Sequence, residues 1–378
     1  MLFVNNGSSF IEMNNQKFKE KFKLLLEKTI FPSDIKDEER SRDWNNIISY
    51  TMAHVPSKLY RFRAYNDYSV DSLKNNTISL VRPDMFYDMY DSLIYVDTTK
   101  IESLIKNALS PAFLLKFIEY CHEKKEVPPL FTSIFNDEIC QSVLENILSM
   151  STDNIIDGIK AISTWDITPI KKFVKRSVVL TEKLIKENPM TKIACFTEDV
   201  CSKIMWDRYA DGYKGFAVEY DFSEYVFSLC AKCDKRDCLD RVHPYLFPII
   251  YSDCRYDATE IVHYYSTLDM SQQTKSQNNI PFPDTLFWIK AFLYKDKETY
   301  AYEKEWRFMC CCENRVQENH IELTVKKPTA IYYGTYLPHE QKKELSLIAR
   351  SKGIKEYEMY VNNNTASYLL NYREIEND

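Results

Sequence analysis

Charged and aromatic residues alternate in one short stretch, residues 297–309, which reads KETYAYEKEWRFM. As an extended strand, it would place Glu303, Glu305 and Arg307 on one face and Trp306 on the other. Carboxylates two residues apart on a strand lie about 7 Å apart, and a guanidinium can hold one of them. The pattern indicates an acidic site with its own counter-ion, although a solvated ion-pair network on an exposed strand has the same composition.

Shorter stretches predict the strands that would position this site. Their residues are rich in β-branched and aromatic types, and turn residues separate them. The first pair, 59–63 (LYRFR) and 77–81 (TISLV), flanks a short helix with Asn66 or Asp67 as its cap. Strand patterns return at 193–197, 216–220, 248–252 and 328–334.

Composition divides the chain into five segments. We assign residues 1–56 to N-terminal helices, 57–97 to the first part of an α+β core, 98–192 to a helical insertion, 193–352 to the second part of the core and 353–378 to a C-terminal tail. Within the second part, residues 225–247 form a cysteine-rich insertion. The helical insertion is predicted to be a packing layer without chemistry.

The overall composition excludes several classes of protein. Only six glycines occur in 378 residues, and no Gly-rich phosphate-binding motif is present. A net charge of −6 argues against general nucleic-acid binding. Eleven cysteines, an odd number, do not suit a secreted disulfide framework, and no apolar run approaches the ~20 residues that cross a bilayer. We expect a cytoplasmic protein that is not inserted in a membrane.

A second group of residues that could carry out chemistry comprises Cys230, Cys233, Cys238 and His243, spaced C-x2-C-x4-C-x4-H. Thiolates and an imidazole at such spacing can hold zinc in a tetrahedral site, and four protein ligands would make that site structural. In a chain with eleven cysteines, a C-x2-C pair also arises by chance. After residue 309, Cys310, Cys311 and Cys312 alternate on a strand and are expected to pack.

Five stretches in the same order resemble the bacterial domain-of-unknown-function family 2971. They are 59–63 (LYRFR), 194–198 (ACFTE), 205–210 (MWDRYA), 215–221 (GFAVEYD) and 302–307 (YEKEWR). The resemblance runs from about Lys58 to Arg350. The family name implies no activity.

A more distant resemblance is to the ADP-ribosyltransferase fold, whose members split NAD between two small facing sheets. It implies an α+β fold with two small, mainly antiparallel sheets around a central cleft, interrupted here by the large helical insertion. In that fold, a late glutamate binds a ribose hydroxyl and stabilises an oxocarbenium-like transition state, because a carboxylate offsets developing positive charge. The resemblance therefore implies NAD as a substrate.

The resemblance also assigns roles by position. Arg61 would be the first-strand residue, Glu305 the late catalytic acid, and Glu303 its partner in a Glu-x-Glu pair. Further residues expected at the cofactor are Arg63, Thr77, Ser79 and Arg307. The chain departs from the family in lacking histidine on the first strand and in having Tyr87-Asp88 in the aromatic loop. Arg61 could instead form a structural ion pair with Asp88 or Asp91.

Two functions follow from these observations. The first is an NAD-consuming ADP-ribosyltransferase-like or NAD-glycohydrolase enzyme, in a bacterial stress, toxin or phage-defence context, with an unknown acceptor. The second is a non-catalytic interaction or nucleic-acid-binding protein with a small structural zinc module. Tyr225, Phe227 and Tyr245 flank that module and could stack on bases of single-stranded RNA.

Overall fold

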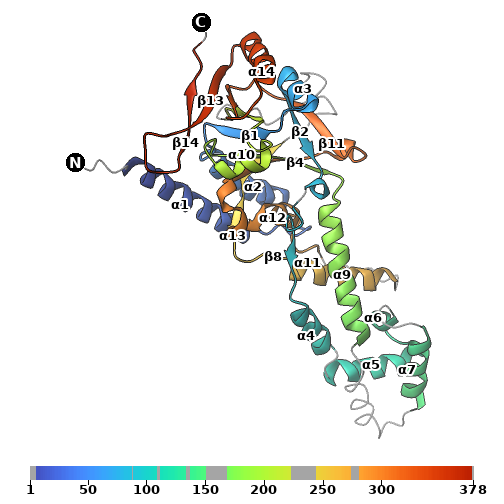
Figure 1. The fold of residues 1–378 in the computed structure, drawn as a ribbon. Coiled ribbons are helices and arrows are strands. Elements are labelled where there is room, and N and C mark those ends of the chain that lie inside the picture. Colours follow the sequence, from blue (N-terminus) through green and yellow to red (C-terminus); the bar gives the residue numbers. More distant parts are fainter. Residues whose placement is uncertain are drawn as a thin grey trace.

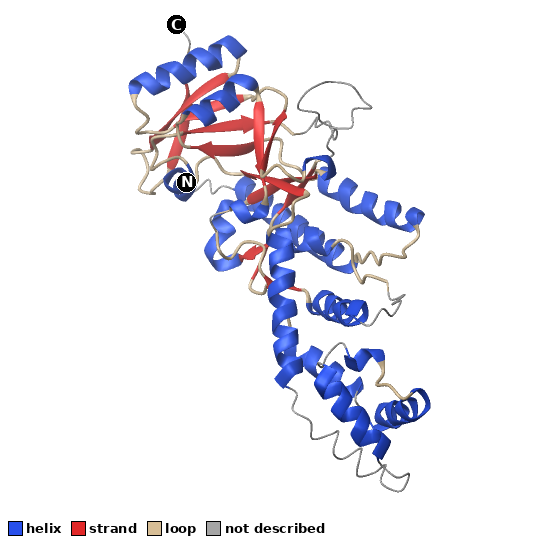
Figure 2. Cartoon of the chain, turned by 90° about the vertical axis from the view of Figure 1, so that its right-hand side faces the viewer, coloured by secondary structure: helices blue, strands red, loops and turns tan. Residues whose placement is uncertain are grey.

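The computed structural model describes residues 6–86, 88–108, 111–132, 137–149, 168–222, 244–273 and 281–376. Within these ranges, ten strands form one mixed, mainly antiparallel sheet (Figures 1 and 2). They are β1 (Leu59–Arg63), β2 (Thr77–Val81), β4 (Thr191–Thr197), β5 (Phe216–Tyr220), β6 (Tyr245–Pro248), β10 (Glu305–Cys311), β11 (His320–Thr324), β12 (Ala330–Tyr333), β13 (Lys355–Val361) and β14 (Leu370–Glu374). Two parallel pairs of short strands are β3 (Ile94–Tyr95) with β8 (Tyr256–Asp257), and β7 (Ile250–Ser252) with β9 (Tyr294–Asp296).

Helices precede, interrupt and follow these strands. The α-helices of the described residues are α1 (Asn6–Lys28), α2 (Asp37–Met52), α3 (Asp67–Asn75), α4 (Thr98–Ala108), α5 (Pro111–Lys124), α6 (Pro129–Thr132), α7 (Asp137–Ser149), α9 (Thr168–Lys186), α10 (Lys203–Tyr209), α11 (Thr259–Gln273), α12 (Phe287–Leu293), α13 (Lys297–Tyr300) and α14 (His339–Lys352). Short 3₁₀ turns are η1 (Pro83–Met85), η3 (Ala301–Glu303) and η4 (Glu313–Arg315). None of the helices in the described ranges combines the length and the apolar composition needed to cross a membrane.

Strand β4 is shared by two parts of the sheet. Along one edge it pairs with β10, where Glu305 lies opposite Thr197. Its other edge is divided, because β2 pairs through Val81 opposite Ile193 and β1 pairs through Tyr60 opposite Thr197. One part therefore runs β11-β2-β4-β10-β6 and the other β4-β1-β5-β12-β13-β14. The mainly antiparallel α+β class is confirmed, but the strands form one sheet divided at β4 rather than two small sheets.

One face of the sheet is covered by α10, and we call it the α10 face. Residues directly opposite in antiparallel strands point to the same face, so Tyr60, Thr197 and Glu305 share a face. Phe62, two residues beyond Tyr60, packs edge-on against Trp206 of α10 with ring centroids 5.1 Å apart. Glu305 therefore points toward the side of the sheet on which α10 lies.

The opposite face is covered by α1, and we call it the α1 face. Phe18 of α1 stacks on Trp306 with a centroid distance of 5.9 Å. Trp306 lies opposite Phe196 of β4. Apolar side chains of β4 and β10 on this face form part of the main hydrophobic core.

Residues 353–376 belong to the sheet, so the prediction of a C-terminal tail from residue 353 was wrong. Helix α14 connects β12 to β13, and these two strands pair in parallel. Strand β14 then pairs antiparallel with β13. Gly353 ends α14 in a left-handed conformation, with φ of 59°. Within β13, Glu356 and Met359 are buried. Tyr333 donates to Glu356 at 2.6 Å and ties the two parallel strands together.

Between β3 and β4 the chain leaves the sheet as a helical arm, made of α4, α5, α6, α7 and α9 (Figures 1 and 2). Helix α9 buries Val174, Ser177, Thr181 and Ile185, one side chain per turn. Helices α5 to α7 have a hydrophobic core of their own that includes Phe117. The arm is thus helical as expected, but its outer part packs on itself instead of covering the sheet.

Candidate functional site

The charged stretch of the sequence begins in a compact turn. Asp296 caps α13 by accepting a hydrogen bond from the Thr299 amide at 3.1 Å. The 3₁₀ turn η3 follows and ends at Lys304, which has a positive φ of 44°. Strand β10 therefore starts at Glu305, and the prediction that Glu303 lies on the strand was wrong. The turn nevertheless directs both glutamate side chains toward the same lysine.

Lys295 of β9 is that lysine. Its Nζ lies 2.7 Å from Oε2 of Glu303 and 3.1 Å from Oε2 of Glu305. The three side chains are between 4% and 7% exposed. A buried ammonium shared by two carboxylates costs desolvation energy, which close ion pairing and hydrogen bonding offset.

Arg307 joins this cluster to the loop before β3. Its Nε donates to Oε1 of Glu305 at 2.8 Å, and its two terminal nitrogens hold the carboxylate of Asp91. Arg307 also donates to the carbonyl oxygen of Phe292 at 2.5 Å, and Ser92 donates to Asp91 at 2.7 Å. Two cations, Lys295 and Arg307, thus face three carboxylates. We call these five residues, Asp91, Lys295, Glu303, Glu305 and Arg307, the acidic cluster.

Hydroxyl and thiol groups complete the surroundings of the two glutamates. Tyr209, the last residue of α10, donates to Oε1 of Glu303 at 2.7 Å. The backbone amide of Glu305 donates to the Tyr251 hydroxyl at 2.8 Å. Cys195 of β4 lies opposite Arg307 in the ladder, and burial and the charge of Glu305 raise the pKa of its thiol well above the ordinary value.

The pKa values of the two glutamates are shifted in opposite directions. Burial raises the pKa of Glu303, and the attraction of Lys295 offsets only part of that rise. Burial also acts on Glu305, but Arg307 and Lys295 together outweigh it and lower the pKa of Glu305. For Lys295, the two glutamates outweigh burial, so its pKa is raised and the group stays an ammonium. Adjacent carboxyls with pKa values shifted in opposite directions are typical of acid–base sites.

A cavity of about 430 Å³ lies beside the acidic cluster, and Lys295 is the member of the cluster that lines it. Aromatic residues Tyr90 and Tyr300 line it too, with Arg255 and Thr299. The Lys295 ammonium lies 4.4 Å from the centroid of the Tyr300 ring. A cavity of this size can enclose a nucleoside-sized group.

Arg61 does not join the cluster. It follows Tyr60, which shares a face with Glu305, so Arg61 projects from the α1 face. Its guanidinium lies 5.9 Å from the centroid of the Phe196 ring and donates to the carbonyl oxygen of Ser79 at 2.8 Å. Burial, with the charge of Arg63 beside it, lowers the pKa of Arg61 to about 10. Arg61 forms neither of the alternative ion pairs, with Asp88 or with Asp91, in the part of the chain that the structure describes; Arg307 holds Asp91.

The remaining predicted cofactor residues lie near Arg61 rather than near Glu305. Thr77 and Ser79 are in β2, opposite Thr324 and Glu322 of β11. Arg63 lies over the ring of Tyr68, 5.6 Å from its centroid. Of the residues predicted for the site, the structure brings together Glu303, Glu305 and Arg307 and separates the others from them.

The predicted zinc ligands, Cys230, Cys233, Cys238 and His243, lie outside the described residues. Strand β6 includes residues 245–247, so the end of the segment assigned to the insertion belongs to the main sheet. Among the residues that the structure does describe, no group of three or more potential ligands is arranged to hold a metal ion.

Three residues of the site were not assigned to it from the sequence: Lys295, Tyr209 and Asp91. Lys295 lies two residues before the charged stretch, and the fold of α13 and η3 brings the glutamates back onto it. Tyr209 is in the MWDRYA stretch, whose link to the late glutamates is visible only in three dimensions. Asp91 was considered as an ion-pair partner, but for Arg61.

Comparison with known proteins gives one finding. Residues 205–308 match the sequence model of a family described as protein of unknown function (DUF2971). Searches of curated proteins and of solved structures found no match to this chain. The matched segment runs from α10 through the first residues of β10 and contains Tyr209, Lys295, Glu303, Glu305 and Arg307. Four of the five residues of the acidic cluster therefore lie in the segment that resembles this family.

Proposed function

We propose that this chain cleaves a glycosidic bond of a nucleotide substrate, with NAD as the first candidate, at Glu303, Glu305 and Lys295. One observation carries the proposal: two carboxyls with oppositely shifted pKa values contact one lysine that lines a cavity. Glycosidic bond cleavage commonly uses a pair of carboxyl groups that have different roles in the reaction.

The chemistry assigns a different task to each carboxyl. The bond between ribose C1′ and the nicotinamide nitrogen breaks, and its electron pair leaves with nicotinamide, which becomes neutral. Positive charge then develops on the ribose, where ionised Glu305 would stabilise it. Water or an acceptor attacks C1′ and loses a proton. Glu303 would take that proton, since a raised pKa makes a carboxylate a more effective base near neutral pH.

Lys295 would connect the substrate in the cavity with the two glutamates. It is the cluster residue that lines the cavity, and it holds both carboxylates. For the substrate to reach Glu303 or Glu305, a ribose hydroxyl must replace one of the two contacts of Lys295. Arg61 has no role in this scheme, because it projects from the α1 face. NAD consumption would be consistent with the expected stress, toxin or phage-defence setting.

The decisive experiment measures nicotinamide release from NAD by the purified full chain and by Glu305→Gln. The variant should lose at least about 100-fold in rate, the effect of removing one preorganised electrostatic group. Its circular dichroism spectrum should stay that of the wild type. Glu219→Gln is a matched control on the same face of the sheet and should keep the wild-type rate. No nicotinamide release and no acceptor labelling by the wild-type protein would refute the proposal.

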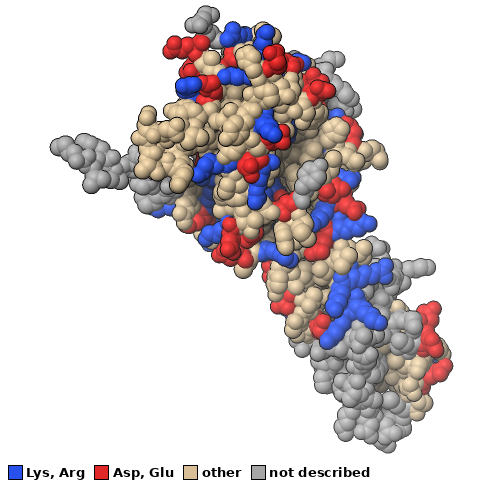
Figure 3. Space-filling model, in the orientation of Figure 1, with Lys and Arg blue, Asp and Glu red and all other residues tan. Residues whose placement is uncertain are grey.

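A second function is favoured by the surface charge of the arm. Lys171, Lys172, Lys175 and Arg176 are close together on α9, and Lys and Arg side chains gather on this part of the arm (Figure 3). A basic patch suits an acidic partner such as RNA. In this alternative, the chain is a non-catalytic binding protein with a zinc module at Cys230. Stoichiometric zinc that is lost in Cys230→Ser, with RNA binding but no NAD turnover, would favour it.

A further inference from the structure

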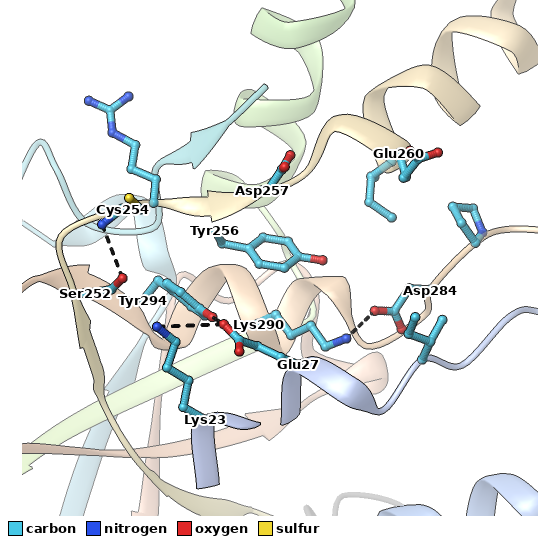
Figure 4. Close-up of a pocket in the computed structure, with 14 residues that line it drawn as sticks. Lys23, Glu27, Ser252, Cys254, Tyr256, Asp257, Glu260, Asp284, Lys290 and Tyr294 are labelled. Carbon is cyan, nitrogen blue, oxygen red and sulfur yellow. Dashed lines mark hydrogen bonds and ion pairs between the residues drawn. The ribbon is translucent and has the colours of Figure 1, made fainter. Parts of the chain in front are cut away.

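A second cavity, of about 410 Å³, shares part of its lining with the first. Figure 4 shows the residues that line this second cavity. Helix α1, the segment from Ser252 to Asp257, the start of α11 and the region around α12 enclose it. The two cavities have four lining residues in common: Ser252, Cys254, Arg255 and Tyr294. The segment from Ser252 to Arg255 and the side chain of Tyr294 therefore lie between two cavities of similar volume.

Most charged groups of the second cavity are already paired. Lys290 contacts Asp284 at 2.6 Å, and both side chains are buried (Figure 4). Glu27 accepts a hydrogen bond from Tyr294 and lies 3.9 Å from Lys23 (Figure 4). These paired groups have little free charge to offer a ligand.

Arg255 differs from them. It is exposed, it lines both cavities, and it forms no side-chain hydrogen bond or ion pair with any residue that the structure describes. In the first cavity, Lys295 is already held by Glu303 and Glu305. Arg255 is thus the cation available to a ligand that extends from one cavity into the other. A guanidinium binds phosphate oxygens through two parallel hydrogen bonds.

Each cavity also offers a surface for a ring. Tyr256 lies at the centre of the second cavity (Figure 4), and Tyr90 and Tyr300 line the first. Aromatic side chains provide flat apolar contacts for bases. The arrangement therefore offers a ring-binding surface in each cavity and a free cation where they join.

We propose that the two cavities form one site for a dinucleotide, with one nucleoside in each cavity and the linking phosphates on Arg255. The inference deepens the proposed function, since NAD is such a molecule, and it rests on that function for the identity of the substrate. It places the glycosidic bond to be cleaved beside Lys295 and the second nucleoside beside Tyr256. The adenosine half would then act as a binding handle distant from the reacting bond.

Calorimetry with the full chain tests this inference with four probes: NAD, ADP-ribose, AMP and nicotinamide mononucleotide. ADP-ribose lacks the bond to be cleaved, so its binding is measured independently of turnover. We expect ADP-ribose and NAD to bind at least about tenfold more tightly than either mononucleotide, because they occupy both cavities. Arg255→Ala should weaken ADP-ribose binding by about tenfold or more, the usual effect of removing a charged hydrogen-bond partner.

Two further variants separate this outcome from a general loss of structure. Arg255→Lys keeps the charge but loses the two-pronged geometry, so it should restore part of the affinity. Arg373→Ala, on the edge strand β14 with a side chain 69% exposed, should bind ADP-ribose as the wild type does. The inference is wrong if AMP binds as tightly as ADP-ribose, if ADP-ribose does not bind, or if Arg255→Ala has no effect. Arg255-dependent ADP-ribose binding without nicotinamide release would instead refute only the proposed function.

Discussion

Two buried carboxylates on the same face of the sheet, Glu305 and Glu219, have different surroundings. Glu219 of β5 accepts hydrogen bonds from Tyr332 at 2.6 Å and Thr329 at 2.8 Å, with Lys58 at 3.2 Å. Its partners come from β12, the residue before β12 and the residue before β1, so the bonds tie neighbouring strands together. Neither Glu219 nor Glu305 lines either of the two cavities, and none of the partners of Glu219 lines one of them.

Glu305 is held almost entirely by charges. Arg307 and Lys295 contact its two oxygens, and Lys295 reaches a cavity wall. A carboxylate bound mainly by hydroxyl groups suits a structural role, whereas charges of both signs at a cavity can interact with a ligand. Burial alone therefore does not identify a functional carboxylate. The identity of its partners, and whether a partner lines a cavity, distinguish Glu305 from Glu219.

The largest expected effect comes from removing the central cation of the acidic cluster. Arg307→Met would leave Glu305 and Asp91 buried without their shared partner. We expect a loss of about 3–5 kcal/mol in the free energy of unfolding, the usual cost of breaking a buried ion pair. Urea denaturation measures it. As a control, Arg373→Ala removes an exposed ion-pair residue and should cost at most about 1 kcal/mol. Similar losses in the two variants would contradict the conclusion that Arg307 is the buried partner of Glu305 and Asp91.

A smaller effect should appear in the pH dependence of stability. The lowered pKa of Glu305 means that its charge stabilises the fold above the ordinary glutamate pKa, and this contribution is lost as the pH falls. The raised pKa of Glu303 has the opposite consequence, because stability is lost as the pH rises through that pKa. Each change should be about 1–3 kcal/mol.

Denaturation of the wild type, Glu305→Gln and Glu303→Gln between about pH 2 and pH 8 separates the two contributions. The difference between the wild type and Glu305→Gln should be constant at neutral pH and should shrink as the pH falls below the ordinary glutamate pKa of about 4.3. Relative to the wild type, Glu303→Gln should become more stable as the pH rises above that value. Slopes of the same sign for both variants would show that the two pKa values are not shifted in opposite directions.

The smallest expected effect is that of Glu219→Gln. The amide has the size of the carboxylate and can still accept hydrogen bonds from Tyr332 and Thr329. We expect a loss of about 1 kcal/mol in the free energy of unfolding, measured by urea denaturation. A change in nicotinamide release in this variant would mean that the comparison between the two carboxylates is wrong.

The sequence predicted part of this site because strand periodicity is local. Glu305 and Arg307 alternate with Trp306 and Phe308, and the structure places the two pairs on opposite faces, as a period of two requires. That part of the prediction needed no information about which strands are neighbours.

The rest depended on pairing register and turn geometry, which the residues alone do not determine. A shift of one residue in register moves a side chain to the other face, and register places Arg61 on the face away from Glu305. The positive φ of Lys304 brings Glu303 back onto Lys295. A non-glycine residue in that conformation has no clear signal in the sequence. The same holds for the C-terminal strands, because the position of β13 and β14 in the sheet depends on the pairing of β13 with β12.

The helical arm is inserted between two strands, so the fold can tolerate changes in the length of the arm. The arm leaves after β3 and returns at β4, and its first and last helices, α4 and α9, pack against each other. The entropy of closing such an excursion grows only with the logarithm of its length, by about 0.6 kcal/mol for each doubling. Arms of very different length could therefore be carried by the same sheet without disturbing Glu305.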